Sequence, residues 1–209
     1  GPGQNEIDFR YSDAMSAADN AMHFKTVVKT AALRNGLYAC FSPKPIPGQA
    51  GNGMHINMSV KCSDGTDKSE AFLAGVLAHV REITAFLNPT EESYRRFGEM
   101  KAPRYITWSP ENRSQLIRIP AAKGEYRRIE LRSPDPTANP YLAYALLIHA
   151  GLDGIQKGML PPQPVNENLY TAPRSLTAAL EQLPSSLTEA KQIARSSPFV
   201  TAILPEAML

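Results

Sequence analysis

Three short segments of the chain alternate polar and apolar residues, which is the period of a strand with one open face. Their polar residues are Glu6, Asp8 and Arg10, then His55, Asn57 and Ser59, then Arg128, Glu130 and Arg132. The residues between them, such as Ile56 and Ile129, are apolar and are expected to pack on helices. Because side chains at i and i+2 share a face, neighbouring strands of this kind would form a wall of carboxylate, imidazole and guanidinium groups.

Helices are predicted where apolar residues recur at helical spacing between a capping residue and a glycine or proline. The predicted helices cover 12–36, 69–87, 141–157, 176–182 and 187–196. The predicted strands cover 6–11, 37–42, 54–61, 106–109, 115–120 and 126–132. The eighteen prolines and thirteen glycines favour many short connections. Strands and helices mix without a regular βαβ order, so we expect an α+β fold with a largely antiparallel curved sheet flanked by helices.

Charge and hydropathy exclude several classes of protein. The formal net charge of +2 argues against a general nucleic-acid binder. The longest apolar runs fall far short of the roughly 20 residues that a membrane span needs, and the first residues lack the features of a secretory signal. Two cysteines, Cys40 and Cys62, are too few for a disulfide scaffold or a zinc cluster. We therefore expect a cytoplasmic protein without a membrane or nucleic-acid partner.

Positive charge is concentrated between Arg95 and Arg132. This stretch holds eight arginines and two lysines against four glutamates, a local charge of about +6. Guanidinium groups match the oxygens of carboxylates and phosphates, so the stretch favours an anionic small molecule as ligand. A solvated charged face remains the alternative interpretation.

Carboxylates beside a histidine suit Mg²⁺ or Mn²⁺, of which Mn²⁺ accepts nitrogen more readily. The arginines would then hold phosphate oxygens that the metal bridges. An ordinary solvated strand face is the alternative for each polar set. The chain has no glycine-rich loop of the Rossmann or P-loop kind.

Five motifs in order along the chain resemble the C-terminal catalytic region of glutamine synthetase of the type I bacterial kind. They are GPGQNE at 1–6, KP at 44–45, GNGMH at 51–55, NRS with RIP at 112–120, and RIELR running into PDPTANPYL at 128–142. The resemblance covers nearly the whole chain. It implies that residues 1–209 are part of one catalytic domain, with the small N-terminal domain and some upstream metal ligands of the family missing.

The resemblance implies an ATP-dependent ligase that joins ammonia to the γ-carboxylate of glutamate through γ-glutamyl phosphate. By their places in the motifs, the metal ligands would be Glu6, His55 and Glu130. The nucleotide contacts would be Ser59, Arg118 and Arg128. The glutamate contacts would be Gly51, Asn52, Arg96 and Arg132. Arg113 would neutralise the transferring phosphoryl group.

Two departures from the family pattern concern the acceptor amine. Ala50 stands where the family commonly has an asparagine of the glutamate pocket, unless Asn52 replaces it. Lys101 stands where the family's flap has a glutamate that takes a proton from ammonium, and a lysine would repel ammonium. Glu99 could take over that role, or the ligase could use another amine, or the protein could be a non-catalytic nucleotide-binding paralogue.

The resemblance also implies a homo-oligomeric ring for the full-length protein, a dodecamer in this type, and an inactive isolated fragment. Tyr170 resembles a tyrosine that some bacterial members adenylylate, and a loop anchor is the alternative. His23, His79 and His149 match no motif and are predicted to be packing or surface residues.

Overall fold

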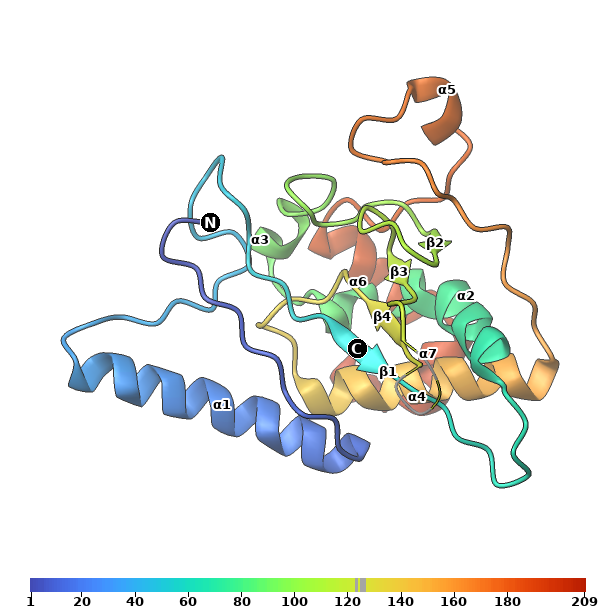
Figure 1. The fold of residues 1–209 in the computed structure, drawn as a ribbon, viewed down its shortest axis with the longest axis horizontal. Helices are drawn as coiled ribbons and strands as arrows, with labels where there is room; N and C mark the ends of the chain where they lie inside the picture. Colours follow the sequence, from blue (N-terminus) through green and yellow to red (C-terminus); the bar gives the residue numbers. More distant parts are fainter. Residues whose placement is uncertain (123, 125–126) are drawn as a thin grey trace.

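The computed structural model describes residues 1–122, 124 and 127–209, and it shows an α+β fold as expected (Figure 1). The described helices are α1 (Ala14–Arg34), α2 (Ser69–Leu87), α3 (Glu91–Tyr94), α4 (Pro140–Lys157), α5 (Arg174–Thr177), α6 (Leu187–Ser196), α7 (Pro198–Ile203) and the 3₁₀ turn η2 (Glu206–Met208). The strands are β1 (Ile56–Met58), β2 (Trp108–Ser109), β3 (Ile117–Arg118) and β4 (Ile129–Leu131).

The four strands form one mixed sheet in the order β1-β4-β3-β2. β4 pairs antiparallel with both β1 and β3, whereas β2 and β3 are parallel. The sheet is therefore mostly antiparallel, as predicted. The strands are shorter than the predicted segments, and predicted strand residue Tyr126 lies outside the described residues.

The main helices begin and end where their capping residues are. The Asp13 side chain accepts a hydrogen bond from the Ser16 amide at the start of α1, and Asn139 caps α4 with Pro140 in its first turn. Gly158 ends α4 in the left-handed conformation that favours glycine. α2 and α6 match their predicted bounds. No helix in the described part of the chain is long and apolar enough to cross a membrane.

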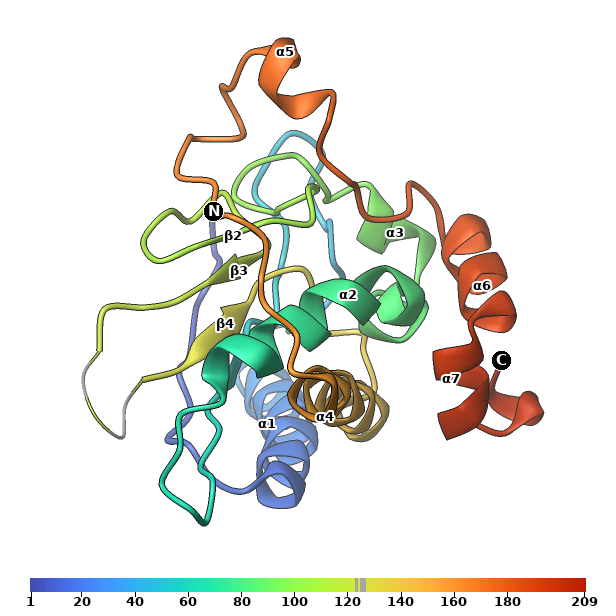
Figure 2. The same ribbon diagram turned by 90° about the vertical axis from the view of Figure 1, so that its right-hand side faces the viewer.

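The core lies where α2 and α4 cross behind the sheet. α2 contacts α4, α6 and α7, and Figure 2 shows it between the sheet and the C-terminal helices. Gly75 of α2 and Gly154 of α4 let the two backbones approach closely. A Cβ at Gly154 would lie 2.2 Å from the Ala71 carbonyl oxygen and 2.7 Å from the Gly75 Cα. Only residues without a side chain fit at this crossing.

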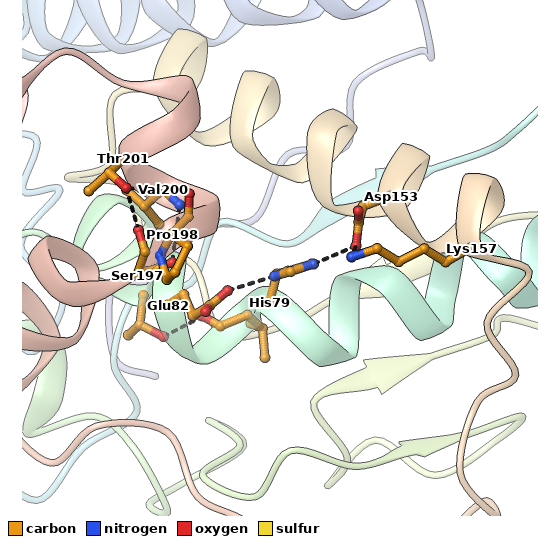
Figure 3. Close-up of polar contacts among 10 residues, drawn as sticks. His79, Glu82, Asp153, Lys157, Ser197, Pro198, Val200 and Thr201 are labelled. Atoms are coloured by element: carbon orange, nitrogen blue, oxygen red, sulfur yellow. Dashed lines mark hydrogen bonds and ion pairs between the residues drawn. The ribbon is translucent and has the colours of Figure 1, made fainter.

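His79 links these helices by polar contacts (Figure 3). Its Nδ1 lies 2.6 Å from Glu82 Oε2 on α2, and its Nε2 lies 2.9 Å from Asp153 Oδ2 on α4. Lys157 also donates to Asp153, at 2.8 Å, and the ring stacks on Phe199 of α7 with centroids 3.8 Å apart. His79 therefore joins three helices, more than the packing or surface role predicted for it.

The predicted strands at 6–11 and 37–42 are wrong, because the structure gives no strand there. Ile7 and Phe9 remain 57% and 52% exposed. Phe9 and Phe41 instead contact Phe24 of α1 edge to face, at centroid distances of 5.2 and 6.1 Å. Alternation in sequence gives a strand only where a partner strand is available. The predicted helix at 176–182 also lies earlier, as α5, because Pro173 sets its start.

Candidate active site

Glu130 is the centre of the polar wall. It stands in the inner strand β4, and the residue is 5% exposed. Its Oε2 accepts a hydrogen bond from Arg118 Nε at 2.6 Å. Its Oε1 lies 3.0 Å from Arg132 Nη1 and 3.1 Å from His55 Nδ1. One carboxylate thus meets two guanidinium groups and an imidazole.

The sheet register explains this convergence. Glu130 is opposite Asn57 of β1 on one side and opposite Arg118 of β3 on the other. Directly opposite residues in an antiparallel pair project from the same face. Arg128, two residues before Glu130, donates from Nε to Asn57 Oδ1 at 3.0 Å. The structure therefore brings together five of the residues that the alternating pattern predicted to share a wall, with Arg118 added from β3.

The electrostatics of Glu130 follow from these neighbours. Burial disfavours its charge and raises its pKa. The hydrogen bonds with His55 and Arg118 and the charge of Arg132 act in the other direction and prevail, so the pKa of Glu130 is lowered to about 2. Glu130 therefore stays ionised under all ordinary conditions, which suits an acceptor of cations.

Arg132 lies deep in the site and keeps an unsatisfied donor. Its residue is 5% exposed, and its Nε has no hydrogen-bond partner. Burial lowers the pKa of Arg132, the negative charge of Glu130 opposes that shift, and the positive charges of Arg118 and Arg113 add to it. A buried donor of this kind usually has a partner, so an oxygen of a bound anion is a fitting acceptor.

Arg96 is buried next to this site but its guanidinium is already occupied. The residue is 3% exposed, and its Nη atoms donate to the carbonyl oxygens of Arg132, Ser133 and Pro134 at 2.9 to 3.3 Å. Burial lowers its pKa to about 10. These bonds hold the segment after β4 in place. Contact between Arg96 and a substrate stays a prediction.

The loop at 43–53 carries the predicted substrate residues Gly51 and Asn52. A Cβ at Gly51 would lie 2.3 Å from the Pro43 carbonyl oxygen, so only glycine fits there. The Gln4 amide donates to the Gly51 carbonyl oxygen at 3.0 Å and to Asn52 Oδ1 at 2.8 Å. Asn52 in turn donates to the Ser42 carbonyl oxygen at 2.8 Å. The loop is therefore well fixed, and the Gly51 carbonyl already accepts one hydrogen bond.

Arg113 is exposed on a loop, and the residues on either side of it, Asn112 and Ser114, are anchored by hydrogen bonds. Asn112 donates to the Asn166 carbonyl oxygen at 2.7 Å, and Ser114 Oγ accepts from the Leu169 amide at 2.9 Å. Ser59 is exposed just after β1. Burial raises the pKa of nearby Tyr170, and the charges of Arg132 and Arg96 oppose that shift, which places its ring close to these arginines.

Glu6 does not join His55 and Glu130. It lies in the exposed segment before α1 that has no partner strand. Within the residues that the structure describes, no group of three or more His, Cys, Asp or Glu side chains could hold a metal ion. An imidazole and a carboxylate fit Mn²⁺ or Mg²⁺ in chemistry, but two donors are fewer than a site made by protein alone needs.

Glu99, the predicted flap acid, forms an ion pair that sequence reasoning missed. Its Oε2 lies 3.0 Å from the ammonium group of Lys44, whose side chain is 7% exposed. In the sequence, Lys44 stood out only as part of the motif at 44–45. No periodic pattern predicts that its side chain contacts Glu99, which lies some fifty residues further along the chain.

A buried carboxylate and an imidazole among several guanidinium groups lie on one sheet face, and such a set of side chains is complementary to a polyanionic ligand. The family model for "Glutamine synthetase, catalytic domain" matches residues 1–209, and the chain belongs to this family.

Similar proteins include a glutamine synthetase of Clostridium saccharobutylicum, 46% identical over 90% of this chain and 46% of its own length. One from Staphylococcus aureus (strain MW2) is 44% identical over 97% of this chain and 49% of its own length. The solved structure "GmaS/ADP complex-Conformation 1" is 35% identical with a TM-score of 0.85, and covers 95% of this chain and 49% of its own. "Apo GmaS without ligand" is 36% identical with a TM-score of 0.83, over 95% and 48%. The chain thus spans about half the length of these relatives.

Proposed function

We propose that the full-length protein is an ATP-dependent ligase that joins ammonia to the γ-carboxylate of glutamate through γ-glutamyl phosphate. The observation that carries the proposal is the cluster around Glu130. Membership of the glutamine synthetase family supports this ligation reaction, and the structural similarity to GmaS in complex with ADP supports nucleotide binding. We further propose that it works in the cytoplasm as a homo-oligomeric ring, a dodecamer by its resemblance to type I enzymes.

The residues of the wall suit phosphoryl transfer between two anions. Arg118 and Arg128 would hold nucleotide phosphate oxygens, with Ser59 nearby, and Arg113 would neutralise the phosphoryl group as it moves. The unsatisfied Nε of buried Arg132 would receive a carboxylate oxygen of glutamate. Gly51 and Asn52 would border the glutamate site, and Glu99 would receive a proton from the amine.

His55 and Glu130 would hold a divalent cation, Mg²⁺ or Mn²⁺, with Glu6 as a ligand of a second one. Such an ion supplies charge neutralisation at the phosphate oxygens when it is bound. Because the described residues offer two converging donors, nucleotide oxygens and further protein groups would have to complete the site. For the same reason we expect no glutamine synthesis by residues 1–209 alone.

The experiment is an assay of the full-length protein with ATP, glutamate, Mg²⁺ or Mn²⁺ and ammonium, in which glutamine and phosphate are both measured. We expect stoichiometric formation of the two products. Phosphate or glutamine formation that does not depend on glutamate and ammonium would contradict the proposal.

A second candidate is a γ-glutamyl-amine ligase that uses a larger amine. Lys101 and Ala50 favour it, because Lys101 stands in place of the flap acid that would attract ammonium, and Ala50 is smaller than the asparagine common at its position. The same assay with a panel of primary amines separates the two. Full turnover with ammonium and none with larger amines would eliminate the second candidate.

A further inference from the structure

Lys44 is a buried cation outside the wall around Glu130. Its side chain is only 7% exposed, although lysine is rarely buried unless it is paired. Its ammonium group donates to the Gln49 carbonyl oxygen at 2.8 Å and to Glu99 Oε2 at 3.0 Å. The first contact lies within its own loop at 43–53. The second reaches the turn at 98–102, which lies far away in sequence.

The loop and the turn also share Arg96. The methylene groups of Arg96 pack on Gly51, where a Cβ would come within 2.8 Å of Arg96 Cδ. The backbone of Arg96 then leads into the turn, since its carbonyl oxygen accepts from the Glu99 amide at 3.3 Å. Arg96 fixes the base of the turn, and Lys44 reaches its exposed part.

The turn itself adopts a conformation that needs outside support. Met100 and Lys101 have φ angles of 39° and 77°, in the left-handed region that residues other than glycine rarely adopt. Such conformations persist where the surroundings hold them in place. Two backbone hydrogen bonds close the turn, Gly98 N–H to the Ala102 carbonyl and Ala102 N–H to the Glu99 carbonyl. Met100 is 53% exposed, so it contributes little packing.

We propose that Lys44 is a positioning residue that holds the turn at 98–102 over the loop at 43–53 through Glu99, and thereby keeps water from the acyl-phosphate intermediate. This inference rests on the proposed function. Without the tie, a water oxygen would attack the γ-carbonyl carbon, the bond to the phosphate oxygen would break, and glutamate and phosphate would be released with a proton passed to solvent. ATP would then be consumed without formation of a γ-glutamyl product.

The first test measures this uncoupling in the full-length protein. Phosphate and γ-glutamyl product are quantified for the parent, Lys44→Met, Lys44→Arg and Lys191→Met, the last a matched control at an exposed position of α6. We expect the ratio of phosphate to product to rise several-fold in Lys44→Met. It should stay near the parent's value in Lys44→Arg, whose guanidinium can still pair with Glu99, and in the control. A purely structural role for Lys44 would lower both products together and leave the ratio unchanged, which would overturn the proposal.

The second test needs no catalysis. Hydrogen exchange of the amides of Gly98 and Ala102 is compared in the substrate-free full-length proteins. Lys44→Met and Glu99→Gln should each accelerate exchange at these two amides, and the double variant should add little, because both remove the same ion pair. Unchanged exchange in both single variants would refute the tie. If the parent makes no γ-glutamyl product at all, the proposed function fails, yet the exchange result still decides whether Lys44 holds the turn.

Discussion

The close crossing of α2 and α4 makes Gly154→Ala a demanding test of the fold. The added Cβ would lie 2.2 Å from the Ala71 carbonyl oxygen, about 1.2 Å inside the 3.4 Å at which ordinary contact begins. The opposing atoms are helix backbone, including Gly75 N at 2.6 Å, so no side-chain rotation relieves the clash. The two helices would have to move apart.

The expected magnitude combines two opposing effects. Overpacking a close-packed core costs typically 1–3 kcal/mol, and a gap of 0.5–1 Å forfeits a quarter to a half of the dispersion energy of each contact. Alanine is favoured over glycine in a helix by about 1 kcal/mol. Because the clash involves rigid backbone over several atoms, we expect a net loss of about 2 kcal/mol.

Native-state hydrogen exchange of the α2 and α4 amides in the full-length protein measures this loss. A change of about 2 kcal/mol corresponds to roughly 30-fold faster exchange of the best protected amides, since 1.4 kcal/mol is tenfold. Gln156→Ala is the matched control, because it places alanine at an exposed position of the same helix without a clash, and it should leave these amides unchanged. Slower exchange in Gly154→Ala would mean that helix propensity outweighs the clash, and that the backbones of α2 and α4 are further apart than the 2.2 Å contact with the Ala71 carbonyl oxygen implies.

Three further predictions concern charged groups. Arg113→Ala in the full-length protein should lower kcat by orders of magnitude, because the proposed role of Arg113 is to neutralise charge in the transition state. The fold should be kept, because Arg113 is exposed. An unchanged rate would remove Arg113 from the mechanism. His79→Phe keeps the stacking on Phe199 but removes both ring nitrogens that contact Glu82 and Asp153. It should lower the protection of the α2 and α4 amides against hydrogen exchange by about 2 kcal/mol, and equal protection in the two proteins would contradict this. Lys157 and His79 hold the pKa of Asp153 below its ordinary value, so their pairing with Asp153 stabilises the fold above pH 3.8, and this stability is lost as pH falls through the lowered pKa. Acid unfolding of Lys157→Met should therefore depend less on pH below pH 3.8. An unaltered acid-unfolding profile would count against the pairing.

The sequence predicted the long helices well because two independent signals agree in each. Asn139 and Pro140 begin α4, and its apolar residues recur at helical spacing until Gly158. Period-two alternation likewise predicted that His55 and Glu130 face the same side. The same alternation at Glu6 misled, because a local pattern does not reveal whether a partner strand exists.

The contacts that the sequence could not provide are those set by tertiary packing. Nothing about Arg96 in the sequence distinguishes a guanidinium that binds a substrate from one that donates to three backbone carbonyls. His79 matches no motif, and its two carboxylate partners depend on the angle at which two helices cross. Lys44 and Glu99 meet only because a loop and a turn fold over each other.

The saturation of Glu130 bears on the order in which ligands can arrive. Both of its oxygens are already engaged, by Arg118 on one side and by Arg132 and His55 on the other. An incoming cation must compete with these three side chains for the same lone pairs, and a guanidinium group that it displaces becomes available to an anion. Cation and anion should therefore assist each other's entry, so that a titration with either one alone would understate the affinity found when both are present.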